Sequence, residues 1–292
     1  MLCQMTRSHA LALALSLAAS IVAQTPATPP ASMQQILLPS HGSTLLGVFY
    51  LAAGAGPHPT AVILHGFPGF EQNLDLAQTL RAHGWNALAL HYRGSWGVQG
   101  DFSFQHAAED ADTEVQFVLD PANARKYRID PHRVIVIGHS MGGYMAASAA
   151  AHNPGVAGAV LISAWNIGAE YEHGRLAGGA APTVEAEAKS LGDEGNLAPL
   201  AGTSGKALAT EIHEHQQALN FNNLAPSIAP RPMFVITSSD GLAPDNHAFA
   251  EALRRAGDTH VSERHWDTDH GYSGERAELA AAILEWIEKN LR

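Results

Sequence analysis

Short apolar runs alternate along the chain with longer stretches whose apolar residues recur every three or four positions. The short runs predict strands, and the longer stretches predict helices that bury one face. The predicted strands cover residues 33–39, 43–52, 60–66, 85–92, 133–138, 158–164 and 231–238. The predicted helices cover residues 73–84, 103–120, 141–152 and 244–257, followed by a last helix with Leu279, Ile283, Leu284, Ile287 and Leu291 on one face.

This order of elements is typical of an α/β fold. The first two strands flank a His41-Gly42 turn, which favours an antiparallel pair. Beyond them strands and helices alternate, so right-handed crossovers predict a mostly parallel sheet with helices on both faces. Pro121 is expected to end the helix over 103–120.

Residues 166–225 break the alternation. They lie between two predicted strands and are rich in Gly, Ala and Glu. At roughly sixty residues they are too long for a plain loop. We therefore predict a small, mainly helical cap, inserted into one domain that spans residues 34–292.

Residues 1–33 predict a targeting segment and a linker. Arg7 precedes an apolar run over 10–23 that is too short to span a bilayer and ends in a small residue. This pattern predicts a signal peptide over 1–23, cleaved after Ala23, with an uncleaved anchor as the alternative. Residues 24–33 are expected to be a flexible linker. We expect a secreted or periplasmic protein with no stable membrane anchor, and cleavage would remove Cys3, the single cysteine.

Composition narrows the classes of function. The 292 residues carry 17 basic and 28 acidic side chains, a formal charge of −11, so nucleic acid is not expected as a partner because its phosphates would be repelled. A hydrophobic fraction of 46% excludes wholesale disorder. The pattern indicates no particular oligomeric state.

The sharpest chemical signal is Gly138-His139-Ser140-Met141-Gly142, which matches G-x-S-x-G. It follows the predicted strand over 133–138 and opens a predicted helix, which is the context of a nucleophile elbow. Ser140 is therefore the candidate nucleophile. A serine hydroxyl needs a neighbouring base, and with 17 histidines composition alone does not select one.

Chain order selects the partners, because in this kind of fold the acid follows the serine and the histidine comes last. Asp240 follows a late predicted strand, and Asp245 is the second choice. His270 lies in a polar turn before the last helix, and His265 is the second choice.

The remaining part of such a site is a pair of backbone amides that stabilise the oxyanion of acyl transfer. One is expected at Met141, directly after the nucleophile. The other is expected at Phe67, in the loop after the first parallel strand, since Pro68 has no N–H. His65 in the same loop is expected to be structural.

Other candidates are weaker. Trp96 and Trp165 either line an apolar substrate pocket or pack in the core or cap. Arg93 is expected to brace a loop. His213-Glu214-His215 invites a metal site, but side chains two apart on a helix do not share a face. We expect neither a metal nor a cofactor.

The segments HGFPGF, HYRGSWG, GHSMGG, SSDGLAP and DHGYS resemble the α/β-hydrolase superfamily in order and spacing, from about residue 34 to the C-terminus. The likeness is closest to the dienelactone-hydrolase-like and prolyl-oligopeptidase-like branch. It implies the α/β-hydrolase fold, a triad of Ser140, Asp240 and His270, and oxyanion amides at Phe67 and Met141. Two features depart from that branch: dienelactone hydrolases use a cysteine nucleophile, and the propeller of the oligopeptidases has no counterpart before residue 34.

The resemblance and the residues together predict a secreted serine hydrolase that cleaves a small carboxylic ester. The alternative is an exopeptidase or acyl-peptide hydrolase with the same triad and a short peptide as substrate. That alternative needs acidic side chains in the pocket, for which Glu170, Glu172, Glu185 and Glu187 are candidates. A non-catalytic binding protein is a third possibility, which an intact triad disfavours.

Overall fold

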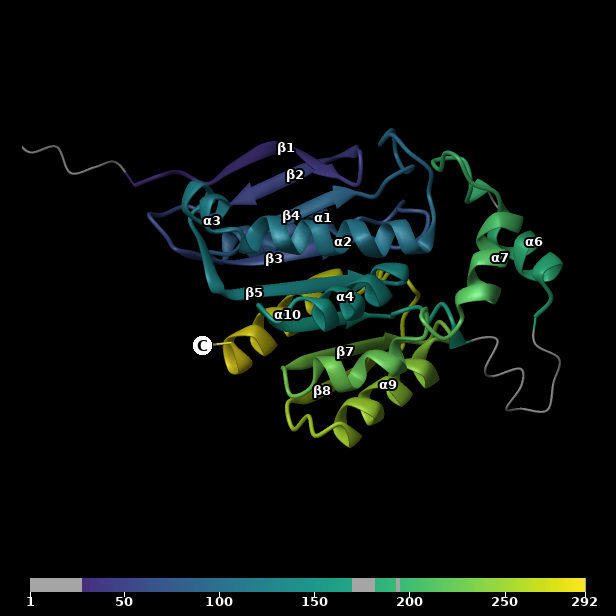
Figure 1. Cartoon of the computed structure of the whole chain (residues 1–292). Coiled ribbons are helices and arrows are strands. Elements are labelled where there is room, and N and C mark those ends of the chain that lie inside the picture. Colours follow the sequence, from purple (N-terminus) through teal and green to yellow (C-terminus); the bar gives the residue numbers. More distant parts are fainter. Residues whose placement is uncertain (1–27, 170–181, 193–194, 292) are drawn as a thin grey trace, which may run out of the picture.

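Eight strands form one sheet in the order β1-β2-β4-β3-β5-β6-β7-β8 (Figure 1). The computed structural model of the chain describes residues 28–169, 182–192 and 195–291. β1 pairs with β2 and β2 with β4 in antiparallel register, and the other pairings are parallel. The strands are β1 (Ser32–Ser40), β2 (Ser43–Leu51), β3 (His58–Leu64), β4 (Asn86–His91), β5 (Ile129–His139), β6 (Val156–Ile162), β7 (Met233–Ser238) and β8 (Val261–Trp266).

The central strands are buried because layers on both faces of the sheet exclude water. All residues of β3 are buried, and β4, β6 and β7 each bury all but one residue. Their continuous apolar runs are what a doubly covered parallel sheet requires. β8 differs, since it is one of the two edge strands and exposes Glu263, Arg264 and His265. It has no apolar run, and sequence patterning therefore did not predict it.

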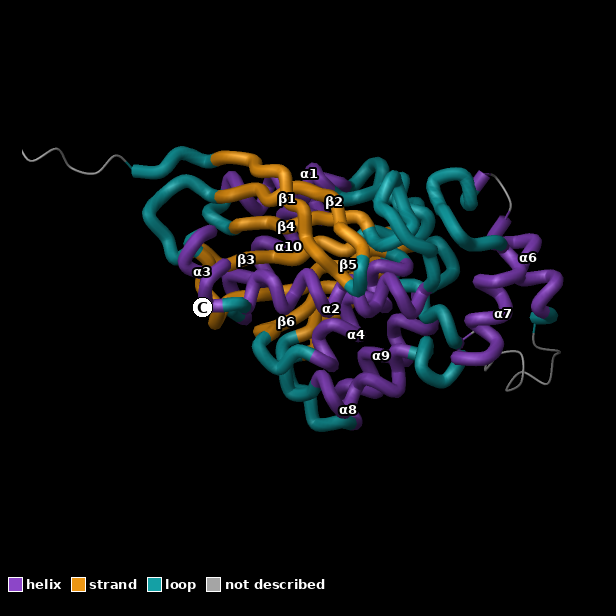
Figure 2. The backbone as a smooth tube through the Cα atoms, turned by 45° about the horizontal axis from the view of Figure 1, so that its top comes forward, coloured by secondary structure: helices purple, strands orange, loops and turns teal. Residues whose placement is uncertain are grey.

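Helices cover both faces of this sheet (Figures 1 and 2). On one face lie α1 (Leu74–Ala82) and α10 (Arg276–Asn290), whose Leu80, Ile283 and Trp286 join one apolar cluster. On the other face α2 (Phe104–Leu119), α3 (Pro121–Tyr127), α4 (Met141–His152), α8 (Ala225–Ile228) and α9 (Ala243–Arg255) join a second cluster. The predicted α/β class, with helices on both faces of a mostly parallel sheet, is confirmed.

The end of α2 lies where the sequence predicts it, but Pro121 also begins a new helix. The Asp120 side chain accepts hydrogen bonds from the amides of Ala122 and Asn123, each at 2.9 Å, and so caps α3. Proline suits the first turn of a helix, where its missing N–H has no acceptor. The chain therefore turns at Asp120 and continues as helix.

Between β6 and β7 the structure describes α6 (Val184–Gly192), α7 (Gly205–His215) and the 3₁₀ helix η2 (Phe221–Leu224) besides α8. α6 and α7 pack together and stand beyond the carboxyl ends of the strands, at the right of Figure 1. Glu211 on α7 joins them to the core, since its carboxylate accepts from the amides of Phe104 (3.0 Å) and Gln105 (2.7 Å) at the start of α2. These helices form the predicted small cap, whose boundaries at 166 and 225 stay predictions.

The predicted signal peptide over 1–23 and the linker residues up to 27 lie outside the described residues. The linker was expected to reach residue 33, but Ser32 and Met33 already pair with Leu51 and Tyr50 in β1. The folded part of the chain therefore includes Ser32 and Met33, because their backbones pair with β2. In the described part of the chain no helix is long and apolar enough to cross a bilayer.

Candidate active site

Ser140 sits on the sharp turn between β5 and α4, with φ 59° and ψ −124°. This is a strained conformation for a residue with a side chain. The turn is held against the end of β6, because the Ser140 amide donates to Ile162 O and the Trp165 amide donates to Ser140 O, both at 2.9 Å. It also requires Gly142, where a Cβ would lie 2.0 Å from the carbonyl oxygen of Leu64.

Asp240 and His270 come from the loops after β7 and β8, and a hydrogen bond of 2.7 Å joins His270 Nδ1 to Asp240 Oδ2. The Asp240 side chain is 6% exposed and that of His270 is 42% exposed, so the acid lies beneath a ring that faces solvent. Burial by itself raises the pKa of Asp240, but hydrogen bonds, first from His270 and then from the Leu242 amide, hold the pKa well below its usual range. Asp240 is therefore ionised and able to fix the imidazole tautomer.

The second choices for acid and base lie elsewhere. Asp245 is in the first turn of α9. His265 is on the edge strand β8, where its Nδ1 lies 2.9 Å from Thr237 Oγ1.

Ser140 and His270 line one cavity of about 160 Å³, together with the loop that follows β3. Among the contacts of the described residues, no hydrogen bond joins the Ser140 hydroxyl to His270. Such contacts are often long before a substrate is bound and tighten in the reacting complex. The three side chains thus lie together at the carboxyl end of the sheet, and the hydrogen bond between Asp240 and His270 is already formed.

The loop after β3 runs past Ser140 and contains Phe67, one of the two residues whose amides are expected to stabilise an oxyanion. Gly66 lies so close that a Cβ there would be 2.9 Å from Ser140 Cβ, and Phe67 follows in the wall of the same cavity. The amide of Met141 is at the first position of α4, where no acceptor exists within the helix. Neither amide donates to a protein group in the described hydrogen bonds. Both are therefore free to meet a developing negative charge.

His65 supports this loop from below. Its ring is buried, and Nδ1 lies 2.8 Å from the carbonyl oxygen of Gly66. Burial, reinforced by neighbouring His91, lowers the pKa of His65 to about 4. The ring is neutral at pH 7 and structural, as the sequence suggests.

Comparisons with known proteins agree with the fold. Residues 61–282 match the family described as "Alpha/beta hydrolase family". This chain belongs to the alpha/beta hydrolase family.

Solved structures of other hydrolases share the fold. An esterase of Pyrococcus furiosus superposes with a TM-score of 0.63 at 16% identity, over 90% of this chain and 92% of that one. The carboxylesterase EstE1 from a metagenomic library gives 0.63 at 17% identity, over 91% of each chain. At these identities the likeness shows the fold alone.

A curated relative from Mycobacterium phage D29, named "Putative non-heme haloperoxidase", is 32% identical over 150 residues. The match covers 51% of this chain and 49% of that protein, so the chain spans about half the length of the relative.

The two tryptophans proposed for the pocket of this alpha/beta hydrolase are not among the residues that line the cavity. Trp96 donates from Nε1 to Pro68 O at 2.7 Å and stacks on the ring of His91. Trp165 packs edge-on against Phe104, with ring centroids 5.5 Å apart. Of the two roles that the sequence left open for these tryptophans, their contacts therefore favour packing behind the walls of the cavity.

Three residues that line the cavity had no role predicted from the sequence: His139, Phe70 and Glu71. His139 is buried, its Nε2 donates to the carbonyl oxygen of His270 at 2.8 Å, and its ring lies 4.6 Å from that of His270. Burial, then the nearby His270, lowers the pKa of His139 to about 4, so it is neutral at pH 7. A histidine next to the nucleophile was the only signal for it in the sequence.

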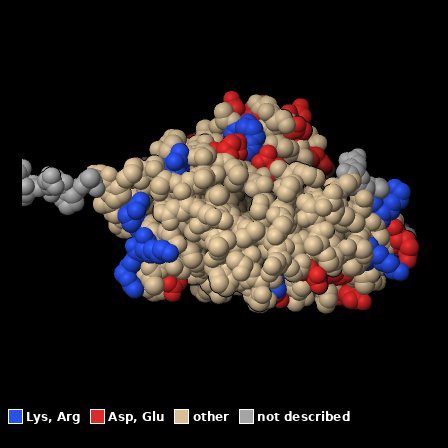
Figure 3. Space-filling view, turned by 90° about the horizontal axis from the view of Figure 1, so that it is seen from above, with Lys and Arg blue, Asp and Glu red and all other residues tan. Residues whose placement is uncertain are grey.

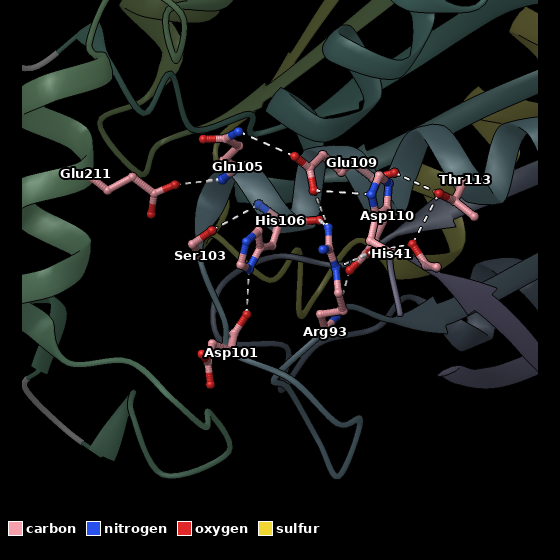
Figure 4. A network of polar contacts seen from close by, with 11 residues as sticks. His41, Arg93, Asp101, Ser103, Gln105, His106, Glu109, Asp110, Thr113 and Glu211 are labelled. Atoms are coloured by element: carbon pink, nitrogen blue, oxygen red, sulfur yellow. Dashed lines mark hydrogen bonds and ion pairs between the residues drawn. The ribbon is translucent and has the colours of Figure 1, made fainter. Parts of the chain in front are cut away.

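Arg93 is a brace, as expected. It is buried and joins the loop after β4 to Asp110 and Glu109 on α2 (Figure 4). In the part of the chain that the structure describes, no group of His, Cys, Asp or Glu is placed to hold a metal ion. On the face shown in Figure 3, the charged side chains of the described residues gather toward the margins and form no continuous basic surface.

Proposed function

We propose that this alpha/beta hydrolase is a serine hydrolase that cleaves a small carboxylic ester through an acyl-enzyme. The observation that carries the proposal is the 2.7 Å hydrogen bond between His270 and Asp240, at a cavity that Ser140 also lines. A nucleophile at a strained turn, a base and a buried ionised acid are the parts that activation of a serine hydroxyl needs.

The mechanism follows from these positions. Nδ1–H of His270 donates to Asp240, so Nε2 is free to take the Ser140 proton as the hydroxyl attacks the ester carbonyl. The amides of Phe67 and Met141 stabilise the oxyanion of the tetrahedral intermediate. The imidazolium of His270 then protonates the departing alcohol, and water repeats the sequence on the acyl group.

An ester suits the cavity better than a peptide. The volume of about 160 Å³ is well below the roughly 300–1,000 Å³ of sites for larger ligands. Glu185 and Glu187, two candidates for holding a peptide N-terminus, lie on α6 and are not among the lining residues, while Glu170 and Glu172 lie outside the described residues. Glu71 is the carboxylate in the wall, and it already accepts a bond from the amide of Asn73 at 2.5 Å.

The test is hydrolysis of p-nitrophenyl esters from acetate to decanoate by the full chain, alongside an aminoacyl p-nitroanilide. Ser140→Ala should abolish ester turnover. Ser148→Ala, a buried serine on the same helix, is the matched control and should keep it. Ester turnover that survives in Ser140→Ala would refute the proposal, and anilide turnover above ester turnover would favour the exopeptidase.

Two finer proposals accompany this function. The first is that the chain belongs to the dienelactone-hydrolase-like and prolyl-oligopeptidase-like branch, a proposal that the motifs HGFPGF and HYRGSWG support. The apolar run over 10–23 supports export with cleavage after Ala23. N-terminal sequencing of the protein from its culture should then begin at Gln24, and an intact Met1 on the exported protein would contradict the cleavage.

A further inference from the structure

Phe70 is a large apolar side chain exposed to water beside the nucleophile. It is 64% exposed and shares the wall of the cavity with Ser140 and His270. Among the described residues the other exposed large apolar side chains are Met33 and Leu37, both on the edge strand β1. Phe70 is thus the one of the three that lies at the site.

The ring of Phe70 is held in place from behind. It meets Trp96 edge-on, with centroids 5.3 Å apart and planes at 84°. Trp96 is itself fixed by its 2.7 Å bond to Pro68 O. The contact also needs Gly69, because a Cβ there would lie 2.6 Å from Trp96 Nε1. Phe70 therefore presents a pre-positioned aromatic surface toward the cavity.

The size and charge of the cavity limit what this surface meets. A cavity of about 150 Å³ has room for one benzene ring, and this one, whose lining combines apolar and polar groups, measures about 160 Å³. Among the described residues that line it, Glu71 carries the one permanent charge, and no Lys or Arg takes part. A neutral group of the size of one ring fits these limits, and an anionic group would be repelled.

We propose that Phe70 forms an aromatic subsite, and that the substrates are small neutral esters that carry one aromatic ring close to the scissile bond. The ring of the substrate would pack on Phe70 in an offset or edge-on geometry, which aromatic pairs prefer. Trp96 holds Phe70 in position without touching the substrate. This inference rests on the proposed esterase activity and names its substrate class.

The test compares benzyl acetate with cyclohexylmethyl acetate, whose leaving alcohols are similar in size and reactivity and differ in aromaticity. In the wild type, kcat/KM should favour the benzyl ester. Phe70→Leu should lower that preference by about two- to tenfold, and Phe70→Tyr should restore it. Leu37→Ala, at an equally apolar and exposed position, is the matched control and should leave the preference unchanged.

The outcomes separate the two proposals. If Phe70→Leu hydrolyses both esters with the wild-type preference, the subsite is wrong and the esterase stands. If the wild type hydrolyses no ester, the proposed function is wrong and the subsite with it. A preference lost in Phe70→Leu and also in Leu37→Ala would point to a change in the whole fold and would overturn the subsite.

Discussion

Removing the guanidinium of Arg93 should leave a carboxylate buried without its cation. The Arg93 side chain is 7% exposed and that of Asp110 is fully buried, and Nε lies 2.8 Å from Asp110 Oδ1. The same guanidinium reaches Glu109 at 2.6 Å and the carbonyl oxygen of His106 at 2.9 Å (Figure 4). Arg93→Met keeps most of the apolar stem and deletes all these bonds.

The expected loss is about 3 kcal/mol of unfolding free energy at pH 7. Breaking a buried ion pair by removing one partner costs about 3–5 kcal/mol. The lower end applies because Asp110 keeps two hydrogen bonds, from the Ser40 hydroxyl at 2.6 Å and from the backbone amide of residue 93 at 2.7 Å.

The loss should shrink as the pH falls. Burial already raises the pKa of Asp110 above 3.8, although Ser40 and Arg93 act against it, and removing the cation raises this pKa further. A carboxyl group with a raised pKa binds a proton in the folded state that the unfolded state has released. Its stability contribution is therefore lost as the pH rises through the raised pKa and is recovered on acidification.

Urea unfolding of wild type and Arg93→Met at pH 7 and pH 5 measures both effects. The control is Arg133→Met, which breaks the more exposed pair between Arg133 and Asp130 at 2.7 Å and should cost at most about 1 kcal/mol. The reasoning fails if Arg93→Met loses no more stability than this control, or if its loss is larger at pH 5 than at pH 7.

Further predictions concern the site. Asp240→Asn should lower kcat by roughly a thousandfold or more in the ester assay, with little change in melting temperature, because the amide favours the wrong imidazole tautomer; an unchanged kcat would remove Asp240 from the triad. His139→Phe deletes the hydrogen bond to the carbonyl oxygen of His270 and should lower kcat with KM nearly unchanged. His139→Gln, whose side chain carries an N–H donor, should recover part of the lost kcat. Burial lowers the pKa of His139 from 6.5 to about 4 in the folded state. On acidification the unfolded state therefore takes up a proton first, and the stability of the wild type falls as the pH falls from 6.5 to 4. The urea unfolding midpoint of His139→Phe should fall less than that of the wild type over the same pH range. Gly142→Ala should abolish soluble folded protein, since its Cβ would lie 2.0 Å from a backbone oxygen of β3, whereas Gly274→Ala, with open space around the new Cβ, should fold normally; circular dichroism compares the two.

Strands with an apolar run or a regular alternation were predictable, including the edge strand β1, whereas the edge strand β8 has neither pattern and was not predictable. The strand that ends at His139 carries an unbroken apolar stretch, because helices cover both faces of the sheet there and exclude water. The strand over Val261–Trp266 has one neighbour and polar exposed positions, so its sequence carries no periodic signal. It forms because its backbone completes the hydrogen bonds of β7.

In the candidate site, too, some residues were predictable from local sequence and others were not. Ser140 was predictable because an elbow is a local structure, made by glycines and a strand within a few residues of the serine. Chain order selected Asp240 and His270, and their 2.7 Å contact agrees with that choice. The roles of Trp96 and Phe70 were not predictable, since which aromatic ring faces the cavity depends on loops that meet only in the folded chain.

The sequence alone therefore determined the fold class, the family resemblance and the candidate nucleophile. These depend on apolar periodicity and short motifs, which are properties of neighbouring residues. Only the tertiary structure decided that His139 lies under His270, 131 positions away, that Arg93 is buried against Asp110, and that Phe70 faces the cavity. Such contacts join distant segments, and their burial and charge exist only once the sheet has brought the segments together.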